Sequence, residues 1–381
     1  MASSAHAYVR GSTARFYEWL ESSNGVPVPE GPPLWICGDC HVGNLGPVAH
    51  SDGRVAVQIR DLDQTVIGNP AHDLIRLGLS LAMAARGADL PGVTTALMIE
   101  QLVAGYERGL SSPSSERELT KRRPAPIHFV MRRAVQRSWK HLLEERLEDT
   151  EPTIPLGARF WPLQQKEQRA VRELFATPEV QSLITSLRQR EDDASLEVVD
   201  AAYWMKGCSS LGGLRLAVLV HVAGTSLRRG RLCLMDVKEA VQAHAPRYAG
   251  SAMPKSNGER VVTGARALSP YLGERMVAAR VLDRSVFIRE LLPQDLKLEL
   301  DALTAREATE VARFLASVVG RAHGRQLTAS ERKKWKAELG RRRPKSIEAP
   351  SWLWSSVIEL IASHEAAYLN HCRQYALAHA R

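Results

Sequence analysis

The segment between residues 33 and 87 constrains the fold of this chain more than any other part of it. The turn-forming triplet Ser51-Asp52-Gly53 separates two apolar runs, which predicts a β-hairpin. A helix is expected after Asn69-Pro70, and apolar residues on nearly every side of it indicate that it is buried. Two acidic stretches, at Asp39 and at residues 61–63, are therefore expected at the ends of neighbouring strands.

The loop "CGDCH" at residues 37–41 fits several kinds of site. Its C-x-x-C-H spacing is that of covalent haem attachment, and its paired thiols also occur in redox and zinc sites. A zinc site needs further ligands, and the sequence contains no second C-x-x-C and no H-x-x-x-H. We therefore expect Cys37 and Cys40 to be small buried side chains that flank a functional loop.

Composition limits the size class, the location and the kind of site that this chain can have. With 381 residues, of which 44% are hydrophobic and 24% charged, the chain is long enough for two globular lobes. Its start shows no basic segment followed by an apolar run, and no stretch reaches the roughly 18 apolar residues of a membrane span. We expect a cytoplasmic protein without a membrane partner, and this location disfavours covalent haem attachment. The five cysteines are scattered and do not suggest a disulfide framework.

Two carboxylates and an amide at suitable positions indicate phosphate chemistry. Asp39 can accept a hydroxyl proton, and the oxygens of Asn44 and Asp61 are of the kind that hold Mg²⁺. The motif Gly38-Asp39-x-His41-x-x-Asn44, followed by Asp61 and by "GNPAHDL" at residues 68–74, resembles the catalytic segment of aminoglycoside phosphotransferases and other protein-kinase-like enzymes.

This resemblance implies a role for each of these residues. Asp39 would be the catalytic base, Asn44 and Asp61 would be metal ligands, and Asp73 would brace the catalytic loop. The "DLD" run also brings Asp63 near the ion as an additional candidate ligand. The implied cofactors are ATP and Mg²⁺.

A kinase-like site also needs a glycine-rich loop over the phosphates and a lysine on a following strand. In this chain both come after the catalytic motif, in "GCSSLGG" and "LCLMDVKEA". A later β-run, broken by Pro293, resembles the hinge strand whose backbone meets the nucleotide base. The candidate nucleotide-binding residues are Gly207, Ser209, Gly212, Gly213, Lys238, Glu290 and Leu292.

The catalytic motif thus precedes the phosphate loop, which is the reverse of the usual kinase order. The order of these motifs along the chain is similar to that in a bacterial family of unknown function, whose two lobes look circularly permuted. The resemblance predicts an α+β, protein-kinase-like fold with a helical large lobe over residues 1–200, a β-rich small lobe over 201–300, and returning helices over 301–381.

The predicted function is Mg·ATP-dependent phosphoryl transfer to a hydroxyl of an unidentified small molecule or protein. Two features keep a pseudokinase or nucleotide-binding scaffold as the alternative: Ser209 replaces the middle glycine, and no glutamate is an obvious partner for Lys238, with Glu259 as the candidate. Nucleotidyl transfer from the same site is a close variant. Metallophosphoesterases share the Gly-Asp-x-His loop but need further motifs that this chain lacks.

The net charge of +9 raises the separate hypothesis of a nucleic-acid partner. The basic clusters lie among glutamates on expected helices, and no nucleic-acid-binding module is recognisable. We expect a solvated basic face, and a nucleic-acid partner stays the less favoured alternative.

Overall fold

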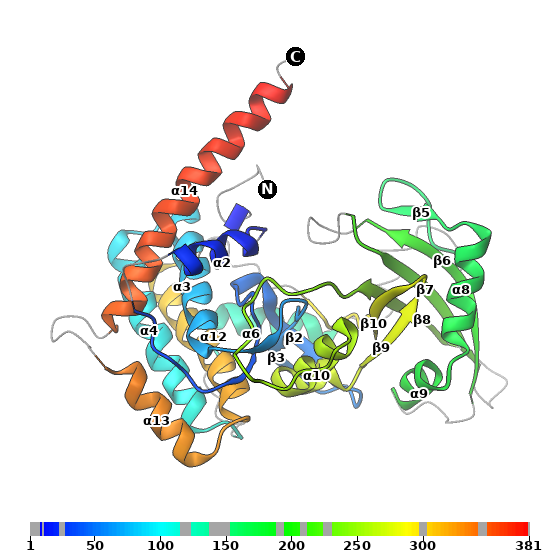
Figure 1. The fold of residues 1–381 in the computed structure, drawn as a ribbon, viewed down its shortest axis with the longest axis horizontal. Coiled ribbons are helices and arrows are strands. Elements are labelled where there is room, and N and C mark those ends of the chain that lie inside the picture. Colours follow the sequence, from blue (N-terminus) through cyan, green and yellow to red (C-terminus); the bar gives the residue numbers. More distant parts are fainter. Residues whose placement is uncertain are drawn as a thin grey trace.

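The structure is a computed structural model that describes residues 8–9, 11–22, 27–114, 123–136, 153–187, 194–205, 212–223, 231–296, 303–341 and 349–379. A mainly helical body and a part built on a β-sheet lie side by side, with short strands and a helix between them (Figure 1). The expected mixture of helices and strands, the α+β class, is confirmed.

The helices that the argument uses are α2 (Thr13–Ser22), α3 (Pro70–Gly87), α4 (Gly92–Ser111), α6 (Ala125–Gln136), α8 (Gln165–Phe175), α9 (Pro178–Ser186), α10 (Asn257–Leu268), α11 (Pro270–Gly273), α12 (Ala305–Gly324), α13 (Ala329–Leu339) and α14 (Ser351–His379). The strands are β1 (Leu34–Ile36), β2 (Leu45–Ala49), β3 (Val55–Ile59), β4 (Val66–Gly68), β5 (Phe160–Pro162), β6 (Ser195–Trp204), β7 (Arg215–Ala223), β8 (Arg231–Glu239), β9 (Met276–Val281) and β10 (Arg284–Glu290).

The segment after residue 33 forms the elements that its sequence predicts. β2 and β3 make an antiparallel hairpin whose turn contains Gly53 at φ 88°. α3 begins at Pro70, and the Asn69 side chain caps it by accepting a hydrogen bond from the Ala71 N–H at 3.0 Å. Because β1 pairs with β4, the loop after β1 and the loop before β4 lie next to each other.

The core of the helical body is the crossing of α4 and α12. Backbone meets backbone there, because a Cβ atom at Gly105 or Gly109 would overlap carbonyl groups of α12, and one at Gly320 would overlap the Tyr106 carbonyl. Small residues permit this close approach. α12 is amphipathic, and Val311, Leu315 and Val319 are buried along one side of it.

The second part is a six-stranded antiparallel sheet in the order β5-β6-β7-β8-β10-β9. α8 and α9 cover one face of it, where Val171, Phe175 and Ile184 pack against residues such as Leu216 and Val218. Both helices precede residue 200, in the range predicted for the larger lobe, but they pack on the sheet. The division of the chain into lobes at residues 200 and 300 stays a prediction. Pro178 begins α9 and separates it from α8.

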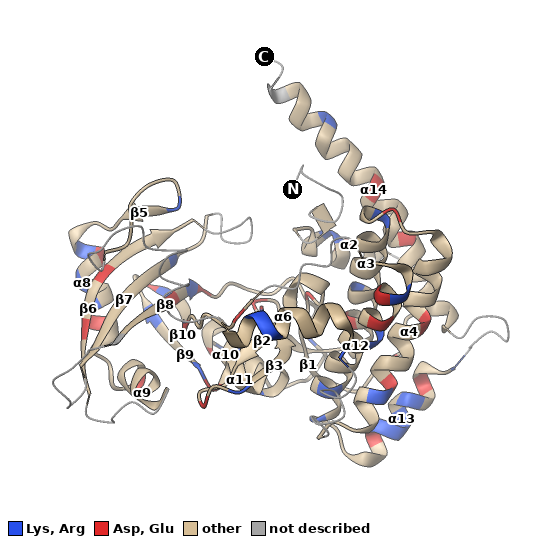
Figure 2. Cartoon of the chain, turned by 180° about the vertical axis from the view of Figure 1, so that it is seen from behind, with Lys and Arg blue, Asp and Glu red and all other residues tan. Residues whose placement is uncertain are grey.

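Charged residues of both signs are interspersed over both parts (Figure 2). On α13 the side chains of Lys333 and Lys334 are exposed near Glu331, in line with the expectation of a solvated face. No helix in the described ranges has both the length and the apolar character needed to cross a membrane.

The α4–α12 crossing makes a testable prediction. Gly109→Ala forces a methyl group against the Ser317 carbonyl, and we expect it to lower the free energy of unfolding by about 1–3 kcal/mol. The control is Gly87→Ala at the end of α3, where an added Cβ meets nothing within 4 Å. Urea denaturation of both variants checks this, and equal stability of the two would contradict the close crossing.

His364 on α14 predicts a pH dependence of stability. It is 2% exposed, its Nδ1–H donates to the Leu360 carbonyl at 3.0 Å, and burial together with the nearby Arg76 lowers its pKa to about 4. The unfolded chain binds this proton near pH 6.5, so the stabilising contribution is complete above that pH and is lost as the pH falls to about 4. The size is on the order of 3 kcal/mol.

His364→Asn keeps a donor for the Leu360 carbonyl but does not titrate. The stability of this variant, measured by urea denaturation between pH 7 and pH 4, should fall less steeply than that of the wild type. Replacement of the exposed His244 by Asn is the control and should leave the slope unchanged.

Candidate functional site

One buried carboxylate, that of Asp73, binds the backbone of the loop after β1. Asp73, fully buried on α3, accepts hydrogen bonds from the Cys37 N–H at 2.8 Å and the Gly38 N–H at 3.0 Å. Gly38 has φ 75°, and a Cβ atom there would overlap the Gln64 carbonyl of the loop before β4. The prediction that Asp73 braces this loop is confirmed.

Cys37 and Cys40 flank the loop as small buried side chains, as expected. They are 0% and 1% exposed, and neither forms a disulfide. A hydrogen bond with Cys40 and burial raise the pKa of the Cys37 thiol well above its usual value, so this thiol is poorly suited to redox or metal chemistry.

Asp39 points toward α3, where Arg76 contacts it. The Arg76 Nε–H donates to Asp39 Oδ1 at 2.9 Å, and its Nη2 donates to the Val9 carbonyl at 2.7 Å. The Arg76 side chain is 1% exposed, whereas that of Asp39 is 15% exposed. The buried arginine therefore fixes one carboxylate oxygen while the aspartate keeps access to solvent.

Asn44 and Asp61 are linked to Asp39 through the backbone. The Asn44 Nδ2–H donates to the Asp39 carbonyl at 3.0 Å, and the Asn44 carbonyl accepts from the Arg60 N–H at 2.7 Å. The residue before β2 and the residues after β3 are thus neighbours. The three positions predicted from spacing lie together at the ends of the short strands.

Lys238 reaches this group from β8. Its Nζ forms an ion pair with Asp63 Oδ2 and lies 3.9 Å from Asp61 Oδ1. Burial lowers the pKa of Lys238, but the two carboxylates more than offset this and raise it. Burial and the adjacent Asp61 raise the pKa of Asp63 to about 6. Desolvation also raises the pKa of Asp61, but Lys238, Arg289 and Arg215 together hold it below its usual value.

One observation indicates that the carboxylates of Asp61 and Asp63 suit a magnesium ion. Asp63 Oδ1 is buried and has no hydrogen-bond partner among the described residues, which leaves this oxygen open to a cation. In the described ranges no cluster of three or more His, Cys, Asp or Glu side chains forms a metal site. A metal would therefore be held by Asp61, Asp63 and the Asn44 amide together with phosphates and water, which suits Mg²⁺.

The loop that carries these carboxylates is clamped by Arg260 on α10. Its guanidinium donates to the carbonyls of Asp63 at 3.0 Å, of Val241 at 2.8 Å, and of Thr65. Arg260 is 4% exposed, and a Cβ atom at Gly264 one turn later would collide with the Thr65 side chain. α10 thus ties the sheet to the loop of Asp61 and Asp63.

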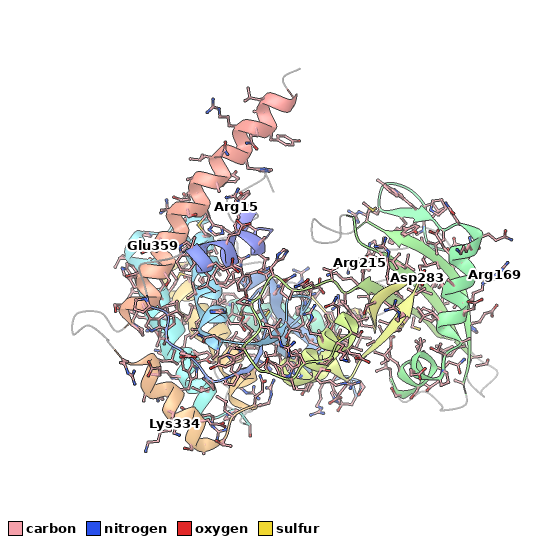
Figure 3. All side chains as sticks on the ribbon, viewed as in Figure 1. Arg15, Arg169, Arg215, Asp283, Lys334 and Glu359 are labelled. Carbon is pink, nitrogen blue, oxygen red and sulfur yellow. The ribbon has the colours of Figure 1, made fainter. Side chains whose placement is uncertain are left out.

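Next to Lys238, the sheet carries a buried ion cluster. Arg215 on β7 donates two hydrogen bonds to Asp236 on β8, at 2.9 and 2.7 Å, and Arg289 on β10 contacts the same carboxylate at 3.2 Å. Asp236 is fully buried. In Figure 3, Arg215 lies on the side of the sheet toward the helical body, opposite to Arg169 of α8.

The other predicted nucleotide-binding residues that the structure describes lie next to β7 and at the end of β10. Gly212, at φ 81°, and Gly213 precede β7, and the following Leu214 N–H donates to Glu239 at 2.7 Å. Glu290 ends β10 and is 0% exposed, and Leu292 is 5% exposed. Gly207 and Ser209 lie outside the described residues. The candidate glutamate partner of Lys238, Glu259, is exposed on α10.

The sequence analysis did not identify three buried charged residues that hold the candidate site together: Arg76, Asp236 and Arg260. A signal existed for two of them, because Arg76 interrupts the apolar run of α3 and Asp236 lies between the apolar residues of β8. A charge at a position whose neighbours are buried needs a partner, and that requirement indicates a site.

The clamp predicts an effect that the rest of α10 does not share. Arg260→Ala leaves the carbonyls of Asp63, Thr65 and Val241 without their donor, and we expect a loss of about 2–3 kcal/mol in stability. Amide hydrogen exchange over residues 62–68 should speed up, and Arg260→Lys should not restore it, because a single ammonium lacks the planar fork. Arg266→Ala, exposed on the same helix, is the control, and equal exchange in both alanine variants would contradict the clamp.

Comparison with known proteins gives the chain a family. A family model described as an uncharacterised protein conserved in bacteria (DUF2252) matches residues 1–374. No curated protein and no solved structure matches the chain. Since the matched region spans nearly the whole sequence, this chain belongs to that family of uncharacterised bacterial proteins.

Proposed function

We propose that this protein is a Mg·ATP-dependent phosphotransferase with a kinase-like, circularly permuted fold. In the proposed reaction an acceptor hydroxyl oxygen bonds to the γ-phosphorus while the bond between that phosphorus and the β,γ-bridging oxygen breaks. The products are a phosphate ester and ADP, and the hydroxyl proton leaves through Asp39.

The ion pair between Lys238 and the loop of Asp61 and Asp63 carries this proposal. It joins residues 175 positions apart in the sequence and brings a strand lysine to the candidate metal ligands. Kinase-like sites need this combination, with the lysine on phosphate oxygens and the carboxylates on the metal. Lys238 contacts Asp63 Oδ2, whereas the second oxygen, Oδ1, is buried and has no hydrogen-bond partner among the described residues. A metal ligand accounts for this second oxygen, and an ion pair alone does not.

The order of elements in the sheet supports the kinase-like part of the proposal. Glycines 212 and 213 lie between β6 and β7, Lys238 lies on the next strand, β8, and the next helix is α10. Protein kinases have the same succession of glycine-rich loop, lysine strand and helix. The helix differs here, because it offers Arg260 to the metal loop instead of a glutamate to the lysine.

Contacts of Gln326 support the permutation. This residue follows α12, and its side chain accepts from the Trp35 N–H at 2.8 Å and donates to the Trp35 carbonyl at 3.0 Å. The end of α12 is therefore beside β1, four residues before Asp39. In an unpermuted kinase-like chain a helix in this place would lead directly into the catalytic loop.

Each residue has a role in the proposed reaction. Asp39, held by Arg76, orients the acceptor hydroxyl through its accessible oxygen. Asn44, Asp61 and Asp63 hold Mg²⁺, which supplies charge neutralisation for the phosphates. Lys238 and the loop of Gly207, Ser209, Gly212 and Gly213 position the phosphates, and Asp73 keeps the loop of Asp39 in place.

One observation favours a second candidate, a nucleotide-binding scaffold without transfer. Lys238 is paired with Asp63, and the candidate glutamate on α10 is exposed, so the lysine has no carboxylate partner from that helix. Asp39→Ala distinguishes the two candidates. In a phosphotransferase this variant keeps nucleotide binding and loses transfer, whereas in a scaffold neither property changes.

The first test is the thermal stability of the protein with ATP, with and without Mg²⁺. Ligand at about 100 times its Kd stabilises the folded state by roughly 2.7 kcal/mol, so we expect a clear Mg²⁺-dependent rise in the melting temperature. Asp61→Asn should abolish most of the rise, because it removes a charged ligand from the metal.

Asp52→Asn is the matched control. The Asp52 and Asp61 side chains are both 43% exposed, but Asp52 lies in the β2–β3 turn. This variant should respond to Mg·ATP as the wild type does. The absence of any shift in the wild type, or an equal loss in both variants, would reject the proposed site.

A further inference from the structure

The expected contact site for the nucleotide base is already occupied by the protein itself. The sequence places the base edge against residues 290–292 at the end of β10. There, the Glu290 carbonyl accepts a hydrogen bond from Arg275 Nη1 at 2.9 Å, and the Leu291 N–H donates to the Leu234 carbonyl at 2.9 Å. The Leu292 carbonyl accepts from the Asp295 N–H at 3.0 Å, and the next residue, Pro293, has no N–H.

These contacts are firmly held. Arg275 is 0% exposed and also donates to both carboxylate oxygens of Asp295, at 3.1 and 3.0 Å. Glu290 is itself 0% exposed, so a base would reach its carbonyl only by displacing the buried Arg275 side chain and its hydrogen bond. Such a bond contributes more than a neutral one, so a base does not displace it at little cost.

The face of the sheet next to this segment is filled as well. On the side of Lys238 it presents Asp236 with its arginines, and beyond them a cluster formed by Trp204, Leu219 and Leu234, each at most 2% exposed. A base is bound by stacking on open apolar surface with a few polar groups at its edge. Neither is offered by the described residues of this face.

The phosphate end of the same site differs. The Asp61 side chain is 43% exposed, one buried Asp63 oxygen has no hydrogen-bond partner within the described residues, and Lys238 lies close to both carboxylates. We therefore expect this site to contact a donor through a metal ion on the carboxylates and through Lys238 on the triphosphate.

We propose that the donor site binds the Mg²⁺-complexed triphosphate and does not read the base, so that nucleoside triphosphates of any base serve as donors. This inference rests on the proposed function and names its donor class. Discrimination between bases requires polar groups that the wrong base leaves unpaired. Here the Glu290 and Leu292 carbonyls and the Leu291 N–H are bonded within the protein, and these three residues are buried, so exchanging adenine for guanine or uracil changes little.

The test compares the binding of ATP, GTP, UTP and adenosine to the full chain by calorimetry in the presence of Mg²⁺. We expect dissociation constants within about threefold of one another for the three triphosphates and no measurable binding of adenosine. A preference for ATP over both GTP and UTP of more than about tenfold, equal to about 1.4 kcal/mol, overturns the inference and leaves the proposed function standing. Binding of none of the triphosphates overturns the proposed function itself.

A pair of variants examines the same point from the phosphate end. Lys238→Ala should weaken ATP, GTP and UTP by the same factor, because the lysine contacts only their shared part. The control is Lys255→Ala, an exposed lysine before α10, which should leave all three affinities unchanged. A loss confined to ATP in Lys238→Ala would overturn the inference.

Discussion

The buried carboxylate of Asp73 is the contact on which the site depends. It accepts two backbone N–H groups from the loop of Asp39 and lies 3.1 Å from His323 Nε2 on α12. Because a carboxylate only accepts, Nε2 donates to it, and Nδ1 accepts from the Tyr106 hydroxyl at 2.9 Å. The Trp335 Nε1–H donates to that hydroxyl at 3.0 Å and ends the chain of contacts.

This chain explains how polar groups survive in the centre of the helical body. All four side chains are at most 2% exposed, and each has a partner of the right kind, so burial leaves none of these contacts unsatisfied. It also connects α3, α4, α12 and α13 to the loop after β1. The close α4–α12 crossing therefore does more than fill space, because it places Tyr106 and His323 within reach of each other.

Local patterns in the sequence predict much of this arrangement. The Ser-Asp-Gly turn, the Asn-Pro helix start and the Asp39-to-Asn44 spacing each describe neighbours along the chain, and the structure has the hairpin, the capped helix and the shared strand ends. The contacts of the buried charged side chains were not predictable in the same way. Arg260 meets a carbonyl 197 residues away, and only the fold determines which helix face turns to that loop.

The outer helices illustrate the same limit. The spacing of apolar residues in α8 and α9 shows that each has a buried face, but it does not show which surface that face covers. The sheet could be identified as their partner only after the strands had paired. Asp236 is similar, since its charge predicts a partner without saying that two arginines from neighbouring strands supply it.

The charge balance of the site has a consequence for ligand binding. The three cations Lys238, Arg215 and Arg289 face the three carboxylates of Asp61, Asp63 and Asp236, so the site offers a free anion little uncompensated positive charge. A triphosphate alone would place further negative charge beside Asp61 and Asp63, which costs energy at short range. A divalent cation on the carboxylates would remove this repulsion and would free the lysine for phosphate. In the proposed function, metal dependence is therefore a requirement of charge balance at this site.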